Sequence, residues 1–228
     1  VDANSVIPKP SSLDFEHAAG FGLTYGTSYY ALKQRACLQP GESLLVLGAA
    51  GGVGISAVDI GKAMGARVIA AASTDQKLSY ATRLGADDVI NYSTEDLRDR
   101  IRELTDGVGV DVVYDPVGGD LAESALRSMA WNGRFLVVGF AAGSIPEIPL
   151  NLPLLKGVSM VGVFWGAWTK RDPAGLVSNF AELFAMVEQG RLSPQVSAAY
   201  PLERYVEAFG ALTGRKAMGK VIFEISGD

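Results

Sequence analysis

A glycine-rich turn between a buried strand and a helix constrains the fold of this chain more than any other sequence feature. The turn, Gly48–Gly54 (GAAGGVG), follows the apolar run Ser43–Leu47, which is typical of a strand buried on both faces. A helical pattern from about Val53 to Met64 comes next, and Ala49 replaces the first glycine of the G-x-G-x-x-G pattern. Small residues allow the backbone to approach a pyrophosphate closely, and the amides and dipole of the helix attract its charge. The turn is therefore either a dinucleotide-binding loop or simply a tight connection.

The same alternation of strand and helix continues through the middle of the chain. The other predicted strands are Arg67–Ala71, Asp88–Asn91, Val110–Tyr114, Arg134–Val138 and Ser159–Phe164. The predicted helices between them are Asp75–Leu84, Thr94–Thr105 (capped by Thr94 or Ser93) and Asp120–Met129. Strand–helix–strand repeats form right-handed units that build a parallel sheet covered by helices on both sides. The sequence therefore predicts an α/β fold with a doubly wound, six-stranded parallel sheet of the Rossmann type.

The sequence before and after these strands does not follow the same alternation. The predicted N-terminal elements are an extended lead-in over 1–13, a helix from about Asp14 capped by Ser11 or Ser12, and a helix from Tyr25 to Ala36. After Trp168 the pattern changes to a C-terminal α/β tail. Its predicted elements are a helix at Pro173–Gln189, a strand at Val196–Tyr200, a helix at Leu202–Leu212 and a strand at Lys220–Ile225.

The composition excludes several classes of protein. Hydrophobic residues make up 48% of the chain and charged residues 20%, so the chain can bury a core and is not disordered as a whole. The net charge of −5, with scattered basic residues, argues against a nucleic-acid or anionic-membrane binder, and no segment approaches the ~20 apolar residues of a membrane helix. A single cysteine excludes an internal disulfide and, with a single histidine, a Cys/His zinc cluster. We expect a reduced, cytoplasmic protein.

Several short motifs occur along the chain in one order. They are Gly48–Gly54, Ala66–Ile69 (ARVI), Lys77 with Asn91 and Tyr92, Val113–Gly118 (VYDPVG), Gly133 with Arg134, Phe164–Gly166 (FWG) and Gly219–Val221 (GKV). In this ordered set the sequence resembles the medium-chain dehydrogenase/reductase superfamily, in its zinc-free quinone oxidoreductase (zeta-crystallin-like) branch. The resemblance extends from about Val6 to Ile225. The strand–helix–strand surroundings of the turn favour a dinucleotide-binding loop over a tight connection.

The resemblance also implies how the chain is divided. Residues 1–23 would be a lead-in and remnant of a catalytic domain, 24–163 a dinucleotide-binding domain, and 164–228 a segment that returns to the catalytic domain. Proteins of this family begin with a barrel-like catalytic domain, which we expect this chain to lack. The chain also opens on Val1 rather than on methionine, as a fragment would. We therefore expect little or no reductase activity from the chain alone.

The residues argue against a metal site. Zinc-using relatives carry a cysteine ligand just before the helix that precedes the first strand, which here corresponds to about Gly22 or Leu23. Cys37 comes too late in the chain, and we interpret it as a small buried apolar residue. His17 is interpreted as a surface or packing residue. The sequence therefore predicts no metal.

The end of the second strand bears on the choice of nicotinamide cofactor. NAD enzymes of this fold usually place an acid there to bind the ribose 2′-hydroxyl, but Ile69–Ser73 contains none. Lys77 lies near the third position of the next helix, where a cation opposes the helix dipole, so a bound anion would explain its position. The resemblance assigns Ser73, Lys77 and Tyr92 to the 2′-phosphate of NADP(H). Alternatively, Lys77 is a solvated helix residue and Tyr92 a loop anchor. Asp75, in the first turn of that helix, is the main argument against NADP(H).

Other residues are expected along the rest of the cofactor. The cofactor-binding residues predicted in the glycine-rich turn are Ala50, Gly51, Gly52, Val53 and Gly54. The resemblance places Thr27, Phe140 and Phe164 near the nicotinamide, with backbone groups holding its amide; core packing is the alternative for the two phenylalanines. Asp115 is expected to be structural, because a carboxylate beside the cofactor phosphates would be unfavourable.

Two functional hypotheses follow. In the first, NADPH delivers a hydride to a quinone or another α,β-unsaturated carbonyl, and no residue of this chain is named as catalytic because no general acid or nucleophile is evident. In the second, the chain is a non-catalytic NADP(H)-binding scaffold or sensor domain. The upstream sequence would separate the two, because a preceding catalytic domain favours the enzyme.

The composition of the sixth predicted strand indicates a homodimer. Met160–Trp168 (MVGVFWGAW) is apolar and uncharged, and no proline interrupts it. An exposed apolar edge strand pairs with another chain unless charge or proline blunts it. In the alternative, the helix at Pro173–Gln189 covers this edge within one chain.

Overall fold

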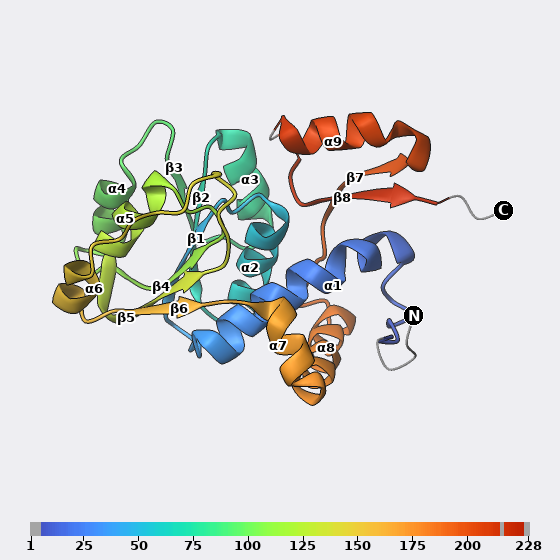
Figure 1. Cartoon of the computed structure of the whole chain (residues 1–228), viewed down its shortest axis with the longest axis horizontal. Helices are drawn as coiled ribbons and strands as arrows, with labels where there is room; N and C mark the ends of the chain where they lie inside the picture. Colours follow the sequence, from blue (N-terminus) through green and yellow to red (C-terminus); the bar gives the residue numbers. More distant parts are fainter. Residues whose placement is uncertain (1–5, 215–216, 226–228) are drawn as a thin grey trace.

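The computed structural model describes residues 6–214 and 217–225 and is built around one six-stranded sheet (Figure 1). Its strands are β1 (Ser43–Leu47), β2 (Arg67–Ala72), β3 (Asp88–Asn91), β4 (Val110–Asp115), β5 (Met129–Val137) and β6 (Ser159–Gly162). They lie in the order β3-β2-β1-β4-β5-β6, and every neighbouring pair is parallel. The predicted doubly wound, six-stranded sheet is confirmed.

Alternate residues of the strands face two hydrophobic cores, one on each side of the sheet. On one side Leu44 and Val46 of β1 face α1 (Phe15–Tyr29) and α2 (Gly52–Ala63). On the other side Leu45 and Leu47 face the remaining core. That second core is covered by α4 (Leu97–Leu104), α5 (Asp120–Arg127) and α6 (Asn151–Lys156). Strands buried on both faces explain why these segments are almost continuously apolar in the sequence.

The N-terminal helices differ from the prediction in two ways. A single helix runs through this region, because α1 continues directly into the π-helical turn η2 (Tyr30–Arg35). Its N-cap is Asp14 rather than Ser11 or Ser12, since the Asp14 carboxylate accepts a hydrogen bond from the His17 amide at 2.8 Å. Of the predicted lead-in, residues 1–5 lie outside the described residues. A carboxylate cap also interacts favourably with the helix dipole, which explains why Asp14 begins the helix.

The helix expected from Thr94 begins later. Asp96 is the N-cap of α4 and accepts from the Asp99 amide at 2.9 Å. Thr94 instead belongs to a turn whose backbone donates to the Asn91 carbonyl, and the Glu95 side chain accepts from the Asn91 amide. The preference of aspartate for the cap position therefore outweighs that of threonine here.

Three further boundaries around the fifth and sixth strands differ from the prediction. The helix α5 ends at Arg127 rather than Met129, and β5 begins at Met129 rather than Arg134. The strand β6 ends at Gly162. Two short helices, α6 and α7 (Trp165–Arg171), were not predicted from the sequence. Short helices carry too little periodicity to be recognised, and tertiary packing decides their ends.

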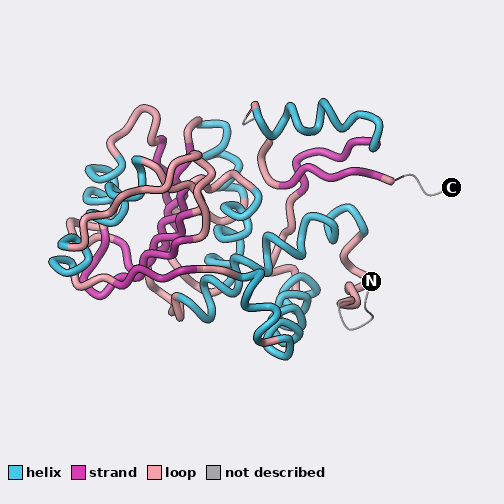
Figure 2. The backbone as a smooth tube through the Cα atoms, viewed as in Figure 1, coloured by secondary structure: helices cyan, strands magenta, loops and turns pink. Residues whose placement is uncertain are grey.

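The C-terminal segment forms a second, smaller sheet beside α1. Its elements are α8 (Pro173–Glu188), β7 (Val196–Pro201), η3 (Leu202–Arg204), α9 (Tyr205–Thr213) and β8 (Lys220–Glu224). Strands β7 and β8 pair in parallel, and Figure 2 shows them apart from the large sheet. The predicted tail is therefore confirmed in its elements, and α8 packs on α1 through Phe184, whose ring lies 5.6 Å from that of Phe21.

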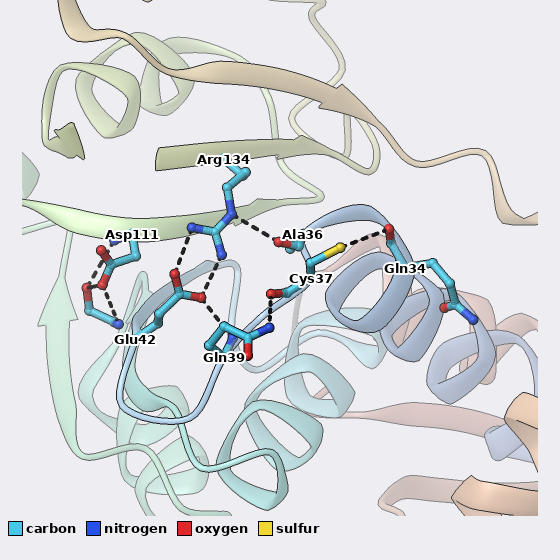
Figure 3. Close-up of polar contacts among 8 residues, drawn as sticks. Gln34, Ala36, Cys37, Gln39, Glu42, Asp111 and Arg134 are labelled. Carbon is cyan, nitrogen blue, oxygen red and sulfur yellow. Dashed lines mark hydrogen bonds and ion pairs between the residues drawn. The ribbon is translucent and has the colours of Figure 1, made fainter. Parts of the chain in front are cut away.

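A polar cluster fixes the amino ends of the strands (Figure 3). The Arg134 guanidinium of β5 donates two hydrogen bonds to Glu42, at 2.9 and 2.6 Å, and a third to the Ala36 carbonyl at 3.0 Å. The Asp111 carboxylate accepts from the amide and hydroxyl of Ser43 at 2.8 and 2.7 Å. These contacts tie the turn after η2 to three strands, at the edge of the sheet opposite their carboxyl ends.

The same turn corrects the interpretation of Cys37. The residue is exposed, and its backbone has a left-handed φ of 49°. Ala36 and Leu38 on either side are buried, so the chain turns sharply and directs Cys37 outward between them. The expectation of a buried apolar cysteine was wrong because the turn directs this side chain away from the core that its two neighbours enter.

Candidate dinucleotide-binding site

The glycine-rich turn brings the end of β1 and the start of α2 into close contact. Gly48 adopts a φ of +59°, and its carbonyl accepts from the Gly51 amide at 2.9 Å. A Cβ atom at Gly54 would lie only 2.2 Å from the same carbonyl oxygen. Glycine at position 54 therefore lets the first turn of α2 pack directly on the loop, as close helix–strand packing in dinucleotide-binding turns requires.

A cleft of about 800 Å³ opens at the carboxyl ends of the strands, above this turn. Its inner wall comes from the loops that follow the first five strands: Gly48, Ala50, Gly51, Gly52, Ala72, Ser73, Lys77, Tyr92, Ser93, Val117, Gly118, Asp120, Leu121, Ala141 and Ala142. Its outer wall comes from the C-terminal segment: Leu212, Thr213, Ala217 and Gly219. Ligands of open α/β sheets bind at this edge, so the position agrees with a cofactor site.

The three residues predicted for the 2′-phosphate lie together in this cleft. Ser73 follows β2, Tyr92 follows β3, and Lys77 is the third residue of α3 (Asp75–Arg83). The Lys77 ammonium donates to the Ser73 hydroxyl at 3.2 Å. A cation and two hydroxyl-bearing side chains thus line one end of the cleft, where they could bind a phosphate.

Asp75, the main argument against NADP(H), has a structural partner. Its carboxylate accepts a hydrogen bond from the side-chain amide of Asn91 at 2.7 Å. Asn91 is almost fully buried at the end of β3, and Asp75 does not line the cleft. The hydrogen bond therefore joins α3 to β3 and gives the Asp75 carboxylate a partner outside the lining of the cleft.

The other predicted cofactor residues fall into two groups. Ala50, Gly51 and Gly52 line the cleft, whereas Val53 and Gly54 lie behind them in the first turn of α2. The residues placed at the nicotinamide by resemblance lie outside the lining: Thr27 is half-buried on α1, Phe140 is 40% exposed after β5, and Phe164 is 76% exposed before α7. The exposure of both phenylalanines is unlike core packing, and their proposed role remains a prediction.

Sequence reasoning missed the outer wall altogether. Gly219 donates its amide to the Ala50 carbonyl at 2.9 Å and forms a parallel bridge with Gly51. The C-terminal segment therefore rests directly on the glycine-rich turn. The Gly219–Val221 motif was the one signal that could have indicated this contact, but a motif gives no spatial partner.

Asp115, at the end of β4, shapes the cleft without lining it. The residue is buried, and its carboxylate accepts from the amides of Val117 and Gly118, both at 2.8 Å. Burial raises the pKa of this carboxyl above its ordinary value, and the two amide donors oppose that shift. The expected structural role of Asp115 is supported by these contacts, which hold the loop whose backbone lines the inner wall.

A buried cluster of hydroxyl groups lies beneath the turn. The Ser28 hydroxyl of α1 contacts the Ser56 hydroxyl of α2 at 2.9 Å and the Tyr114 hydroxyl of β4 at 2.8 Å, and it donates to the Val53 carbonyl at 3.0 Å. Burial raises the pKa of the Tyr114 phenol, so the group stays protonated and can donate to Ser28. The cluster fixes α1, α2 and β4 relative to one another directly under the loop.

The described residues contain no group of three or more histidine, cysteine, aspartate or glutamate side chains that could hold a metal ion. Over the same residues, no helix is both long and apolar enough to cross a lipid bilayer.

Comparisons with known proteins show which proteins this chain is similar to. A family model described as zinc-binding dehydrogenase matches residues 52–182. A quinone oxidoreductase-like protein 2 homolog of Nematostella vectensis is 43% identical over 215 residues, which cover 93% of this chain and 59% of that protein. The solved structure of a mycobacterial protein complexed with NADPH superposes with a TM-score of 0.91 at 30% identity, covering 98% of this chain and 70% of the other.

A second solved structure shows that the fold itself does not fix the cofactor. An NAD-dependent alcohol dehydrogenase superposes with a TM-score of 0.88 at 31% identity, covering 99% of this chain and 63% of the other. The choice between NAD and NADP must therefore come from local residues. The chain spans 59% to 62% of the length of the first curated relatives that it matches.

Proposed function

The chain belongs to the zinc-binding dehydrogenase family within the medium-chain dehydrogenase/reductase superfamily, and from this premise we propose that its cleft binds NADPH for hydride transfer to a quinone or another α,β-unsaturated carbonyl. The observation that carries the proposal is the cluster of Ser73, Lys77 and Tyr92 at one end of the cleft. The oxidoreductase family follows from the comparisons, whereas the cofactor preference and the acceptor are our proposals. A zinc-free mechanism likewise remains a prediction.

The chain's own residues bind and orient the dinucleotide. The first amides of α2 have no partner within the helix and point toward the glycine-rich turn, so they would hold the pyrophosphate. The loop after β4, fixed by Asp115, would bound the adenosine half of the cleft. When bound, the nicotinamide supplies the hydride, and the protein must hold the acceptor carbon within about 3–3.5 Å of it.

The contacts of Lys77 and Asp75 favour NADPH over NADH. Lys77 and Ser73 present a charged and a neutral donor to a 2′-phosphate, and Asp75 is turned to Asn91 instead of toward a ribose hydroxyl. A free carboxylate at the end of β2 would attract the 2′-hydroxyl of NADH and repel the phosphate of NADPH. Lys77 therefore places a positive charge at this end of the cleft.

Titration of Lys77→Ala with both cofactors tests this preference. Charge-assisted hydrogen bonds are worth roughly 1.5–3 kcal/mol, so NADPH affinity should fall about ten- to hundredfold while NADH affinity changes little. Lys170→Ala, on the exposed helix α7, is the matched control and should leave both affinities unchanged. An equal loss for the two cofactors would remove Lys77 from the 2′-phosphate site.

A non-catalytic NADP(H)-binding module is the second candidate. It is favoured by the cleft itself, because no described residue that lines it is assigned as a proton donor to the acceptor. We propose that the chain alone binds NADPH but has little quinone reductase activity. NADPH oxidation in the presence of a quinone measures this directly, and turnover by the 228-residue chain at rates usual for quinone reductases would contradict it.

We also propose the domain division and the homodimer expected from the sequence. All six strands of the large sheet fall between residues 43 and 162, which supports a dinucleotide-binding domain at 24–163. Strand β6 lies at the edge of that sheet, and its Met160 is 40% exposed. Helix α8, which was the alternative cover for this edge, packs against α1. An uncharged, exposed edge favours pairing with a second copy.

Light scattering at micromolar concentration tests the homodimer. The chain should have a dimer mass, and Met160→Lys should shift it toward the monomer because lysine on an edge strand opposes pairing. Val206→Lys, an exposed apolar position on α9, controls for the added charge. A monomer mass for the unmodified chain, unchanged on concentration, would rule the proposal out.

A further inference from the structure

Helix α3 carries two side chains, one turn apart, that reach different parts of the cleft. Lys77 lines the inner wall. Tyr80 follows three residues later, which makes the two side chains neighbours on the helix, and it is buried with 8% of its surface exposed. The Tyr80 hydroxyl lies beside Gly219 of the outer wall, because a Cβ atom at Gly219 would lie 2.9 Å from it. A single helix therefore contacts both walls.

The Tyr80 hydroxyl lies where both strands of the small sheet begin. Gln195 directly precedes β7, and Gly219 directly precedes β8. The hydroxyl is 3.5 Å from the side-chain oxygen of Gln195, and a Cβ atom at Gly219 would lie 3.2 Å from the Gln195 carbonyl oxygen. Because 3.5 Å is long for a hydrogen bond between two oxygens, packing dominates this contact. The tyrosine therefore limits how closely the start of β8 can approach α3.

The surroundings of Tyr80 hold its side chain in place. Its ring belongs to the hydrophobic core on the side of the sheet that α1 and α2 cover, and the Arg83 guanidinium lies over the ring at 5.5 Å from its centroid. Burial raises the pKa of the phenol to about 12, so the group is uncharged at neutral pH. A fixed, uncharged side chain of this length acts as a spacer between α3 and the outer wall.

On its other side Gly219 is held by the glycine-rich turn, because its amide donates to the Ala50 carbonyl at 2.9 Å. We propose that Tyr80 is a positioning residue that sets the separation of the two walls for the dinucleotide, an inference that rests on the proposed function. Tyr80 does not line the cleft itself and acts through Gly219. It sets affinity for NADP and NAD alike, whereas Lys77 sets preference between them.

Titration of Tyr80→Leu with both cofactors tests this role. Leucine keeps an apolar side chain in the core but lacks the outer part of the ring and the hydroxyl. Affinity for NADP⁺ and for NAD⁺ should fall by the same factor, about tenfold, so that their ratio stays constant. Lys77→Ala should instead change the ratio. Ser79→Ala, at an exposed position of the same helix, is the matched control and should leave both affinities unchanged.

A second pair of variants tests the contact itself. In Gly219→Ala the methyl group would lie 2.9 Å from the Tyr80 hydroxyl, so the outer wall must move away from α3. Tyr80→Phe removes that hydroxyl but keeps the ring, and alone it should weaken NADP⁺ binding by no more than about threefold. In the double variant it should restore part of the affinity that Gly219→Ala loses. Losses that merely add would show that this contact does not set the position of the wall.

The outcomes distinguish this inference from the proposed function. If the unmodified chain binds NADP⁺ and folded Tyr80→Leu binds both dinucleotides as tightly, the inference is wrong and the proposed function stands. If Tyr80→Leu weakens NADP⁺ binding alone, Tyr80 acts on Lys77 rather than on the outer wall, and the inference is again wrong. If urea unfolding shows that Tyr80→Leu does not fold, the pair of Gly219→Ala and Tyr80→Phe decides. If the unmodified chain binds neither NADP⁺ nor NAD⁺, the proposed function fails and this inference fails with it.

Discussion

The two walls of the cleft are built in different ways. The inner wall stands on strands such as β1, in which Leu44 through Leu47 are 0% exposed. The outer wall belongs to a segment whose strands β7 and β8 are half-exposed, with Ile222 as their one buried residue. Close packing transmits any change in the inner wall to the whole sheet, whereas the outer wall can shift at lower energetic cost. Substitutions that overpack the inner wall should therefore affect folding, whereas substitutions in the outer wall should mainly affect ligand binding.

The largest effect is expected from Gly54→Ala. The added methyl group would lie 2.2 Å from the Gly48 carbonyl oxygen, so either the first turn of α2 or the end of β1 must move. Both are packed in the buried core, and overpacking there should destabilise the protein by about 3 kcal/mol or more. Urea unfolding of the variant and of the unmodified chain measures the loss.

Gly51→Val provides the contrast within the same turn. A Cβ atom at Gly51 would lie 3.4 Å from the nearest neighbour, the Gly48 carbonyl, and its φ of −73° suits any residue. This variant should fold normally but lose NADPH binding, because the side chain projects where the pyrophosphate would lie. Retained binding would show that the turn is only a connection, and unfolding would show that the inner wall tolerates no change at all.

A smaller effect on stability is expected from Gly219→Ala in the outer wall. The residue has a φ of +97°, which costs about 1–2 kcal/mol for a residue with a Cβ, and the methyl group would also contact the Tyr80 hydroxyl. Because β8 can shift away from the turn, the loss should fall mainly on NADPH affinity. Equilibrium unfolding and NADPH titration of the same variant compare the two losses. A large loss of stability with unchanged affinity would contradict the difference between the walls.

The inner wall could be predicted from the sequence because local patterns determine it. Apolar runs identify the strands, Gly48–Gly54 identifies the turn, and strand ends place Ser73, Lys77 and Tyr92 at one edge of the sheet. One boundary was less accurate because two nearby residues could take one role, as Thr94 and Asp96 could at the start of α4. In such cases side-chain geometry decides, and periodicity contains no information about it.

The outer wall could not be predicted because its contacts join distant parts of the chain. Gly219 meets Ala50 through backbone atoms, and no composition or periodicity encodes such a contact. The partner of Asp75 was missed for a similar reason, since Asn91 is brought beside it by the pairing of β2 with β3. Exposed Cys37 shows the reverse error, because a residue type that is usually buried lies in a tight turn that directs it outward.

The hydroxyl cluster under the turn gives a milder test of the inner wall. Tyr114→Phe removes one buried hydroxyl but leaves Ser28 in contact with Ser56 and the Val53 carbonyl. The ring still fills its space, so the loss should be about 1 kcal/mol, the typical net contribution of one hydrogen bond. Chemical denaturation measures this value. A loss as large as that of Gly54→Ala would mean that the cluster, rather than packing, holds the turn.

The smallest effect is a pH dependence at Asp59, which joins the two regions. Its buried carboxylate on α2 accepts from the Tyr25 hydroxyl at 2.6 Å and from the amide of Ser193, in the link from α8 to β7, at 2.8 Å. Burial raises the pKa of this carboxyl in the folded protein, and the two hydrogen bonds oppose that shift.

A raised folded pKa means that the folded state binds the proton of Asp59 more tightly than the unfolded state does. The stability that this proton contributes is fully present below the unfolded pKa of about 4 and is lost as pH rises through the folded pKa. Asp59→Asn cannot ionise, so its stability relative to the unmodified chain should increase as pH rises from 4 to 8. Urea unfolding of both proteins across that range measures the difference. A difference that stays constant with pH would show that folding does not raise the pKa of Asp59, and that its two hydrogen bonds offset the effect of burial.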